Sequence, residues 1–165
     1  MEKHIYLLRH AKSSWKDLTI PDFDRPLNKR GKRDAPKMGK LLGKMGVSPD
    51  LIISSPAKRT KETISIISKE IHFREKIFYN ENIYDSSADE LLNIIKAFDE
   101  KFNRVLLVGH NPSLTDLVNY LTKDKIDNIP TCGIVGLTFN CSWQNLSDNC
   151  CDTIFFEYFK KNDFI

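Results

Sequence analysis

The stretch RVLLVGHNPS, residues 104–113, decides how the rest of the sequence is interpreted. Its apolar run predicts a buried β-strand, since strands of a parallel sheet are covered on both faces and are continuously hydrophobic. The strand should end at Gly109, and His110 follows it directly. The stretch IYLLRHAKSSW, residues 5–15, has the same form, with Arg9 and His10 closing its apolar run. Ionisable side chains therefore stand where two predicted strands stop.

Four further apolar runs predict strands at 50–54, 76–79, 133–139 and 153–159. Amphipathic spacing predicts helices between them, at 28–46, 60–71, 86–98 and 114–121. Asn28 is the expected cap of the first helix, which Pro36 should bend or delay. Ser87 with Glu90 three residues later forms a capping box for the third helix.

The alternation of strands and helices predicts an α/β fold, a three-layer α/β/α sandwich around a mostly parallel central sheet. The last two strands leave no room for a helix between them, so the C-terminal edge should be antiparallel. The polar segment that joins them, 140–151, could border a pocket or extend into solvent. Residues 1–165 fit the size of a single domain.

Composition excludes several classes of protein. Hydrophobic residues make up 41% and charged residues 28%, and a net charge of +3 without a basic, aromatic-rich stripe argues against a nucleic-acid partner. No segment approaches the roughly 20 apolar residues of a membrane span, and no signal peptide is visible, so we expect no membrane partner and a cytoplasmic location. Four cysteines at irregular spacing predict free thiols. The sequence does not predict the oligomeric state. The cysteines are Cys132, Cys141, Cys150 and Cys151.

The polar residues at the predicted strand ends indicate the chemistry. Ligands of such sheets bind outside the carboxyl ends of the strands, where Arg9, His10, Arg59 and His110 should meet, with Glu81 just past the third strand. Guanidinium groups suit phosphate oxygens, and a neutral histidine can attack phosphorus. The sequence contains no GxxxxGK[ST] loop and no carboxylates at metal-ligand spacing, so we expect neither metal nor cofactor. The pattern favours phosphoryl transfer through a covalent phosphohistidine.

Four blocks, found in order, resemble the histidine phosphatase superfamily, which includes the phosphoglycerate mutases. The similarity is strongest to its compact SixA-type branch of phosphohistidine phosphatases, and the fold of that family agrees with the α/β prediction. The blocks are LLRHAKSSW (7–15), DRPLNKRG (24–31), LIISSPAKRTKET (51–63) and VLLVGHNPSL (105–114).

The resemblance implies a role for each site residue. His10 matches the nucleophile, Arg9 and Arg59 match the phosphate-binding arginines, and His110 matches the second histidine, which donates a hydrogen bond to the same phosphoryl group. Glu81 stands where many relatives carry an acidic proton donor, although a solvent-facing glutamate is an equal interpretation. The other candidate acids are Asp85, Asp17 and Asp24.

The chain departs from the family pattern at several positions. Ser13 fills the hydroxyl position and could contact phosphate, whereas Lys16 stands where relatives carry Asn. Arg25 is either a contact at the rim of the site or a structural ion-pair partner. Trp15 and Trp143 could pack in the protein or stack on a substrate.

The resemblance also bears on the substrate. There is no long insertion between the second and third strands, where larger relatives place a lid, so an open site is expected. An imidazole leaving group, whose protonated form has a pKa near 6.5, leaves with little assistance. These features favour a protein phosphohistidine as substrate. The alternatives are a small phosphoester or nucleotide, or a non-catalytic phosphate-binding domain.

Overall fold

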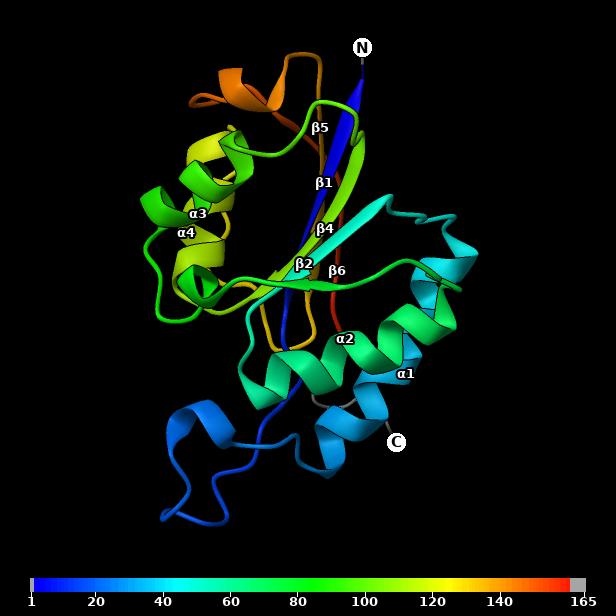
Figure 1. The fold of residues 1–165 in the computed structure, drawn as a ribbon, viewed down its shortest axis with the longest axis vertical. Coiled ribbons are helices and arrows are strands. Elements are labelled where there is room, and N and C mark those ends of the chain that lie inside the picture. Colours follow the sequence, from blue (N-terminus) through cyan, green and yellow to red (C-terminus); the bar gives the residue numbers. More distant parts are fainter. Residues whose placement is uncertain (1, 161–165) are drawn as a thin grey trace.

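The computed structural model describes residues 2–160. Within that range the chain forms one six-stranded sheet, and helices cover both of its faces (Figure 1). The strands are β1 (Lys3–Arg9), β2 (Leu51–Ser54), β3 (Phe78–Tyr79), β4 (Arg104–Gly109), β5 (Ile134–Phe139) and β6 (Asp152–Glu157). The helices are α1 (Lys29–Lys44), α2 (Lys58–Glu70), α3 (Ala88–Lys96) and α4 (Ser113–Leu121). Every predicted strand and helix is present. The single-domain prediction for 1–165 stays a prediction, and Met1 and 161–165 lie outside the described residues.

The strand order is β3-β2-β4-β1-β5-β6. Strands β1 to β4 pair in parallel, while β5 runs antiparallel to β1 and β6 antiparallel to β5. The predicted sandwich with an antiparallel C-terminal edge is confirmed. Because β1 and β4 lie side by side at the centre, the apolar runs that end at Arg9 and at Gly109 are neighbours in space.

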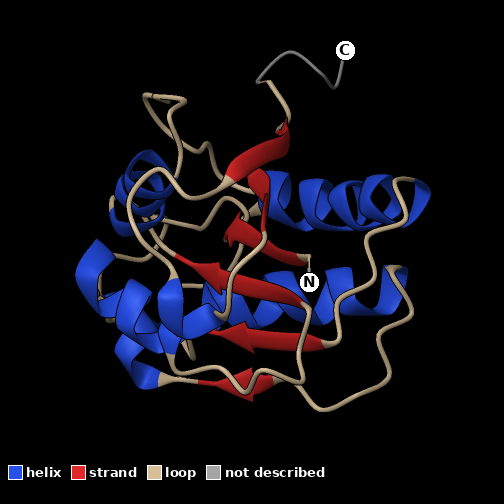
Figure 2. Cartoon of the chain, turned by 90° about the horizontal axis from the view of Figure 1, so that it is seen from above, coloured by secondary structure: helices blue, strands red, loops and turns tan. Residues whose placement is uncertain are grey.

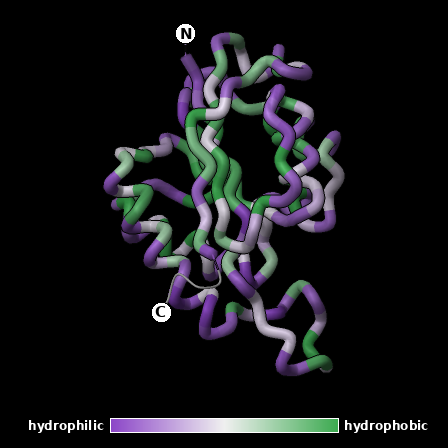
Figure 3. Tube along the Cα trace, turned by 180° about the vertical axis from the view of Figure 1, so that it is seen from behind, coloured by the Kyte–Doolittle hydropathy of each residue, from purple (hydrophilic) through white to green (hydrophobic). Residues whose placement is uncertain are grey.

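The central strands, which have helices on both sides (Figure 2) and are hydrophobic (Figure 3), contribute alternate side chains to two hydrophobic cores. In β1, Ile5 and Leu7 are buried against α3 and α4, whereas Tyr6 and Leu8 are buried against α1 and α2. This alternation is the ordinary consequence of strand geometry. Burial on both faces explains why the central strands read as continuous apolar runs.

Helix α1 begins at Lys29, directly after Asn28, whose side chain accepts a hydrogen bond from the amide of Gly31. It continues through Pro36 without a break to Lys44, so the expected delay by Pro36 is wrong. The cap stabilises the first turn, and the buried face of α1 outweighs the one backbone hydrogen bond that a proline removes.

The segment 140–151 contains a 3-10 turn (Trp143–Asn145) and is packed rather than loose. Trp143 is fully buried against Phe98 and Phe139, and its ring nitrogen donates to the carbonyl of Phe102. Phe139 pairs with Lys3 at the start of β1, so this segment lies at the end of the sheet away from His10. The expected pocket border is therefore wrong, whereas most residues of the segment between its buried anchors are exposed to solvent, and Trp143 is a packing residue.

Within residues 2–160, no helix combines the length and the apolar composition that crossing a bilayer requires. The four cysteines are free thiols, as predicted.

Candidate active site

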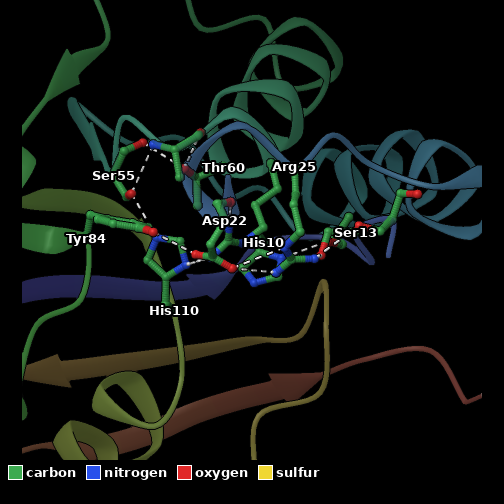
Figure 4. Close-up of polar contacts among 12 residues, drawn as sticks. His10, Ser13, Asp22, Arg25, Ser55, Thr60, Tyr84 and His110 are labelled. Atoms are coloured by element: carbon green, nitrogen blue, oxygen red, sulfur yellow. Dashed lines mark hydrogen bonds and ion pairs between the residues drawn. The ribbon is translucent and has the colours of Figure 1, made fainter. Parts of the chain in front are cut away.

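The candidate site lies at the carboxyl ends of β1, β2 and β4. Arg9 pairs with Gly109 in the sheet register, so the next residue on each strand, His10 and His110, emerges at the same level. Their ring centroids are 5.4 Å apart. Both rings are more than nine-tenths buried. The register of two parallel strands thus brings together residues a hundred positions apart in sequence (Figure 4).

His10 is held in one tautomer. Its Nδ1 lies 2.7 Å from the carbonyl oxygen of Ala11, and because a carbonyl can only accept, Nδ1 must carry the proton. Burial lowers the pKa of His10 to about 3, and the neighbouring His110, Arg59 and Arg9 act in the same direction. His10 is therefore a neutral imidazole at neutral pH, with its lone pair on Nε2.

The loop that supplies this carbonyl is itself fixed. The hydroxyl of Thr63, on α2, accepts a hydrogen bond from the amide of Ala11 at 2.9 Å and donates to the carbonyl of Arg59 at 2.7 Å. The carbonyl of His10 accepts from the amide of Cys132 at 2.9 Å. Thr63 was not predicted, although it ends the block 51–63 that carried the resemblance.

His110 is held in the opposite tautomer. Its Nδ1 lies 3.4 Å from a terminal nitrogen of Arg59, which can only donate, so Nε2 carries the proton and donates to the hydroxyl of Ser55 at 2.8 Å. Burial, followed by the charge of Arg59, lowers the pKa of His110 to about 4. His110 is therefore also neutral at neutral pH, and Ser55 is its partner at the end of β2.

The two arginines give the site its positive charge. Arg9 donates to the carbonyl of Ile129 at 3.0 Å, and Arg59 donates to the backbone carbonyl of Asp22 at 2.7 Å. The Nε atoms of both guanidiniums are buried without a hydrogen-bond partner in the described part of the chain. Burial and the charge of Arg59 lower the pKa of Arg9, which indicates that the two cations are close enough to repel one another. Such a cluster favours binding of an anion.

Asp22, which was not predicted, pairs with this cluster. Its carboxylate accepts from Arg59 at 3.1 Å, from Arg25 at 3.1 Å and from the hydroxyl of Tyr84 at 2.6 Å (Figure 4). Burial favours a higher pKa for Asp22, but these three donors outweigh it and lower the pKa to about 2. The ring of Tyr84 in turn packs edge-on against His110, with centroids 5.5 Å apart. The sequence offered one signal for Asp22, because it lies three residues before Arg25, a spacing at which an ion pair can form.

Arg25 and Ser13 are both buried beside the site. Arg25 donates to the hydroxyl of Ser13 at 2.6 Å, forms an ion pair with Asp22, and lies 3.6 Å from the centre of the Trp15 ring. Arg25 therefore has the structural ion pair that was one of its two predicted interpretations, and Trp15 packs on it.

The fold and this geometry can be compared with known proteins. Residues 5–82 match the histidine phosphatase superfamily (branch 1). An uncharacterized chloroplastic protein of Arabidopsis thaliana is 32% identical over 154 residues, which cover 87% of this chain and 70% of the relative. The chain belongs to the histidine phosphatase superfamily.

Solved structures of SixA proteins share the fold of this histidine phosphatase. The putative phosphohistidine phosphatase SixA from Agrobacterium tumefaciens superposes with a TM-score of 0.82 at 29% identity, covering 94% of this chain and 97% of that one. A protein histidine phosphatase SixA complexed with tungstate gives a TM-score of 0.80 at 17% identity, covering 93% and 95%. Family and fold thus make the chain a phosphatase of the SixA type.

Glu81, the predicted general acid of this histidine phosphatase, forms no hydrogen bond with either histidine in the described part of the chain. Glu81 lies in a 3-10 turn (Glu81–Ile83), is exposed, and its carboxylate makes no hydrogen bond or ion pair within residues 2–160. Asp17, Asp24 and Asp85 are exposed as well. The segment after β3 instead contributes Tyr84.

A metal ion has no evident place in this site. The part of the chain that the structure describes contains no group of three or more His, Cys, Asp or Glu side chains that could hold one. The polar side chains around the two histidines are cationic or hydroxylic, apart from Asp22.

Proposed function

We propose that this histidine phosphatase is a metal-independent phosphohistidine phosphatase that acts on a protein. The lone pair of Nε2 of His10 attacks phosphorus, the phosphorus–nitrogen bond of the substrate breaks, and the substrate ring, protonated on its other nitrogen, leaves as neutral imidazole. Water then attacks the phosphohistidine on His10 and releases inorganic phosphate. The single observation that supports this role is the bond from Nδ1 of His10 to the Ala11 carbonyl, which leaves a buried, neutral ring with a free lone pair.

The surrounding residues stabilise the transferred group in this proposal. Arg9 and Arg59 neutralise its oxygens, and Arg25 and Ser13 extend the binding site from the side of Asp22. His110 donates from Nδ1 to the phosphoryl group. That donation requires its proton to move from Nε2, where the structure has it, and Ser55 can then donate to Nε2 instead of accepting, since a hydroxyl does both.

The exposed position of Glu81, the predicted general acid, supports a substrate with a good leaving group. An imidazole with a pKa near 6.5 leaves without much help, whereas an alkoxide needs a strong proton donor. We assign Glu81 to proton donation only for substrates of the second kind. Asp22 is the other candidate acid, and its pKa of about 2 keeps it ionised while Arg59 and Arg25 hold it. Accordingly, Glu81→Gln should spare aryl phosphates and slow alkyl phosphates, and an equal loss on both would refute the assignment.

The comparisons supply further support. One SixA neighbour is a putative phosphohistidine phosphatase, and another is a protein histidine phosphatase complexed with tungstate, an oxyanion of the same shape as phosphate. Small phosphoesters and nucleotides are the rival substrates. A cytoplasmic location accords with the free thiols and stays a prediction.

The deciding experiment compares substrates in the presence of EDTA. Hydrolysis of a histidine-phosphorylated protein should exceed that of sugar phosphates and nucleotides, and labelled phosphate should be trapped on the enzyme. His10→Ala should abolish trapping, while His72→Asn, a change at a histidine on a turn far from the site, should not. Turnover that disappears with EDTA, or label that persists in His10→Ala, would contradict the proposal.

A further inference from the structure

One stretch of the sequence differs from the rest in charge. Residues 12–33 contain seven Lys and Arg and three Asp, a net charge of +4, while the whole chain carries +3. The remaining residues together are therefore close to neutral. The basic stretch begins two residues after His10 and forms the blue segment that projects at the lower left of Figure 1 before entering α1.

The cations of this stretch line an open groove of about 620 Å³. Its walls include Lys12, Lys16, Lys29, Arg30 and Lys32, and no carboxylate. Arg30 is paired with the buried Asp34. The ammonium groups of the four lysines form no hydrogen bond or ion pair within residues 2–160. The groove is thus lined by four positive charges that the protein itself does not neutralise.

The same segment exposes apolar side chains. Leu18 is 83% exposed and Trp15 61%, the two highest values among the large hydrophobic residues of the described chain. Trp15 is also part of the groove wall. Large apolar side chains on a surface, close together and rimmed by polar groups, are typical of protein interaction sites, where Trp is enriched among the residues that contribute most to binding.

The groove is connected to the candidate site by direct contacts. Ser13 lines the groove and accepts a hydrogen bond from Arg25, and Arg25 pairs with Asp22, which pairs with Arg59. Arg59 in turn contacts His110. A ligand in the groove would therefore lie beside the residues that connect the groove to His110.

We propose that this surface, defined by Lys12, Trp15, Lys16, Leu18, Lys29 and Lys32 and called here the docking surface, binds an acidic, partly apolar patch of the substrate protein beside its phosphorylated histidine. The inference rests on the proposed function and adds the chemistry that selects the substrate. Charge complementarity argues for an acidic partner, because such surfaces raise the rate of encounter. The exposed Leu18 argues for a protein.

A nucleic acid fits this surface less well. Bases stack on open aromatic faces, but the guanidinium of Arg25 lies 3.6 Å from the centre of the Trp15 ring and covers one face of it.

The test exploits two pairs of lysines on one helix. Lys29→Glu/Lys32→Glu reverses two charges of the docking surface, and Lys40→Glu/Lys44→Glu makes the same change on exposed residues at the other end of α1. The probes are an acidic phosphotransfer protein phosphorylated on histidine, free phosphohistidine and p-nitrophenyl phosphate. The first variant should lose about tenfold or more in kcat/KM on the protein, and the loss should shrink as salt screens the charges. Its rates on both small probes should stay within about twofold of wild type, and the second variant should resemble wild type on all three.

A second pair of variants tests the apolar part. Leu18→Ser should weaken turnover of the phosphorylated protein without affecting p-nitrophenyl phosphate, whereas Ile154→Ser, at an exposed aliphatic residue on β6, should affect neither. Equal losses on protein and small probes, or undiminished turnover of the protein by both docking-surface variants, would overturn the inference.

The outcomes separate this inference from the proposed function. If wild type prefers the phosphorylated protein and Lys29→Glu/Lys32→Glu keeps that preference, the docking surface is wrong and the function stands. If wild type hydrolyses the small probes but shows no preference for the protein, the protein substrate itself is wrong and the docking surface falls with it.

Discussion

His10 and His110 face each other with their protons on opposite nitrogens, and a different neighbour fixes each proton. The backbone carbonyl of Ala11 can only accept, so His10 has no choice of tautomer. The partner of His110 is the hydroxyl of Ser55, which can donate or accept. At the scale of single residues, one ring is therefore locked and the other can exchange its proton between nitrogens.

Ser55→Ala tests this difference. Without the hydroxyl, Nε2 of His110 loses its partner, and we expect kcat to fall by about tenfold or more, with a smaller effect on KM, because the lost donation matters most in the transition state. The nitrogen chemical shifts of the His110 ring should change as the tautomer is released. Ser54→Ala is the control, since that hydroxyl donates only to the carbonyl of Ser55. Identical losses in the two variants would show that Ser55 acts through packing alone.

Asp22→Asn tests the competition for Arg59. The carboxylate of Asp22 lies 3.1 Å from the guanidinium that we assign to phosphate, so it opposes binding of a second anion there. Removing its charge should tighten inhibition by vanadate about fivefold, a modest change because Asp22 is half exposed. Inhibition constants measured at neutral pH check the prediction, and weaker inhibition in the variant would mean that Asp22 mainly positions Arg59.

At the scale of elements, the start of α1 packs directly on the loop that follows His10. A Cβ atom added to Gly31 would lie 2.2 Å from the carbonyl oxygen of Lys12, a backbone atom with no room to retreat. The amide of Asn28 donates to the same carbonyl. The helix therefore determines where the loop lies, and only glycine allows so close an approach.

Gly31→Ala should accordingly reduce both stability and activity, by about 1–3 kcal/mol in the free energy of unfolding. Gly43→Ala, on the same helix, meets nothing closer than 3.7 Å and should be neutral or stabilising. Denaturant unfolding and kcat, measured for both variants, check the prediction. A Gly31→Ala protein as stable and active as wild type would show that the loop can move away from α1.

Periodicity predicted the elements well because their buried faces are regular. Strands β1 and β4 are covered on both faces, and α3 has its capping box as predicted. The predictions fail where tertiary packing, rather than periodicity, determines the course of an element. Pro36 is tolerated inside α1 because the helix is buried along one side, and β3, expected over 76–79, is only two residues long at the edge of the sheet.

At the scale of the whole molecule, the buried histidines should make stability depend on pH. The pKa of His10 is lowered to about 3 and that of His110 to about 4, below the ordinary value of 6.5. The unfolded chain therefore binds more protons than the folded chain between these values. The free energy of unfolding that these two histidines contribute is fully present above pH 6.5, and it is lost as the pH decreases toward 4 and 3. Thermal unfolding of wild type should show this fall, and His10→Asn should flatten it. Identical slopes would contradict the burial of neutral His10.

The sequence predicted the architecture and that Arg9, His10, Arg59 and His110 lie near one another beyond the carboxyl ends of the strands. It could not predict Asp22 or Tyr84, because they reach the site from loops whose paths depend on packing rather than on periodicity. Ser55 was visible at the end of β2, but its contact with His110 depends on the side-chain orientation of a residue 55 positions later.

The carbonyl of Ala11 has a consequence for regiochemistry. Imidazole forms two phosphoramidate isomers, on the pros or the tele nitrogen, and a ring whose pros nitrogen is engaged by a backbone oxygen can react only at the tele position. The covalent intermediate should therefore be the tele isomer, which phosphorus and nitrogen NMR of the trapped enzyme can distinguish. Detection of the pros isomer would mean that the imidazole ring rotates away from the Ala11 carbonyl before it reacts.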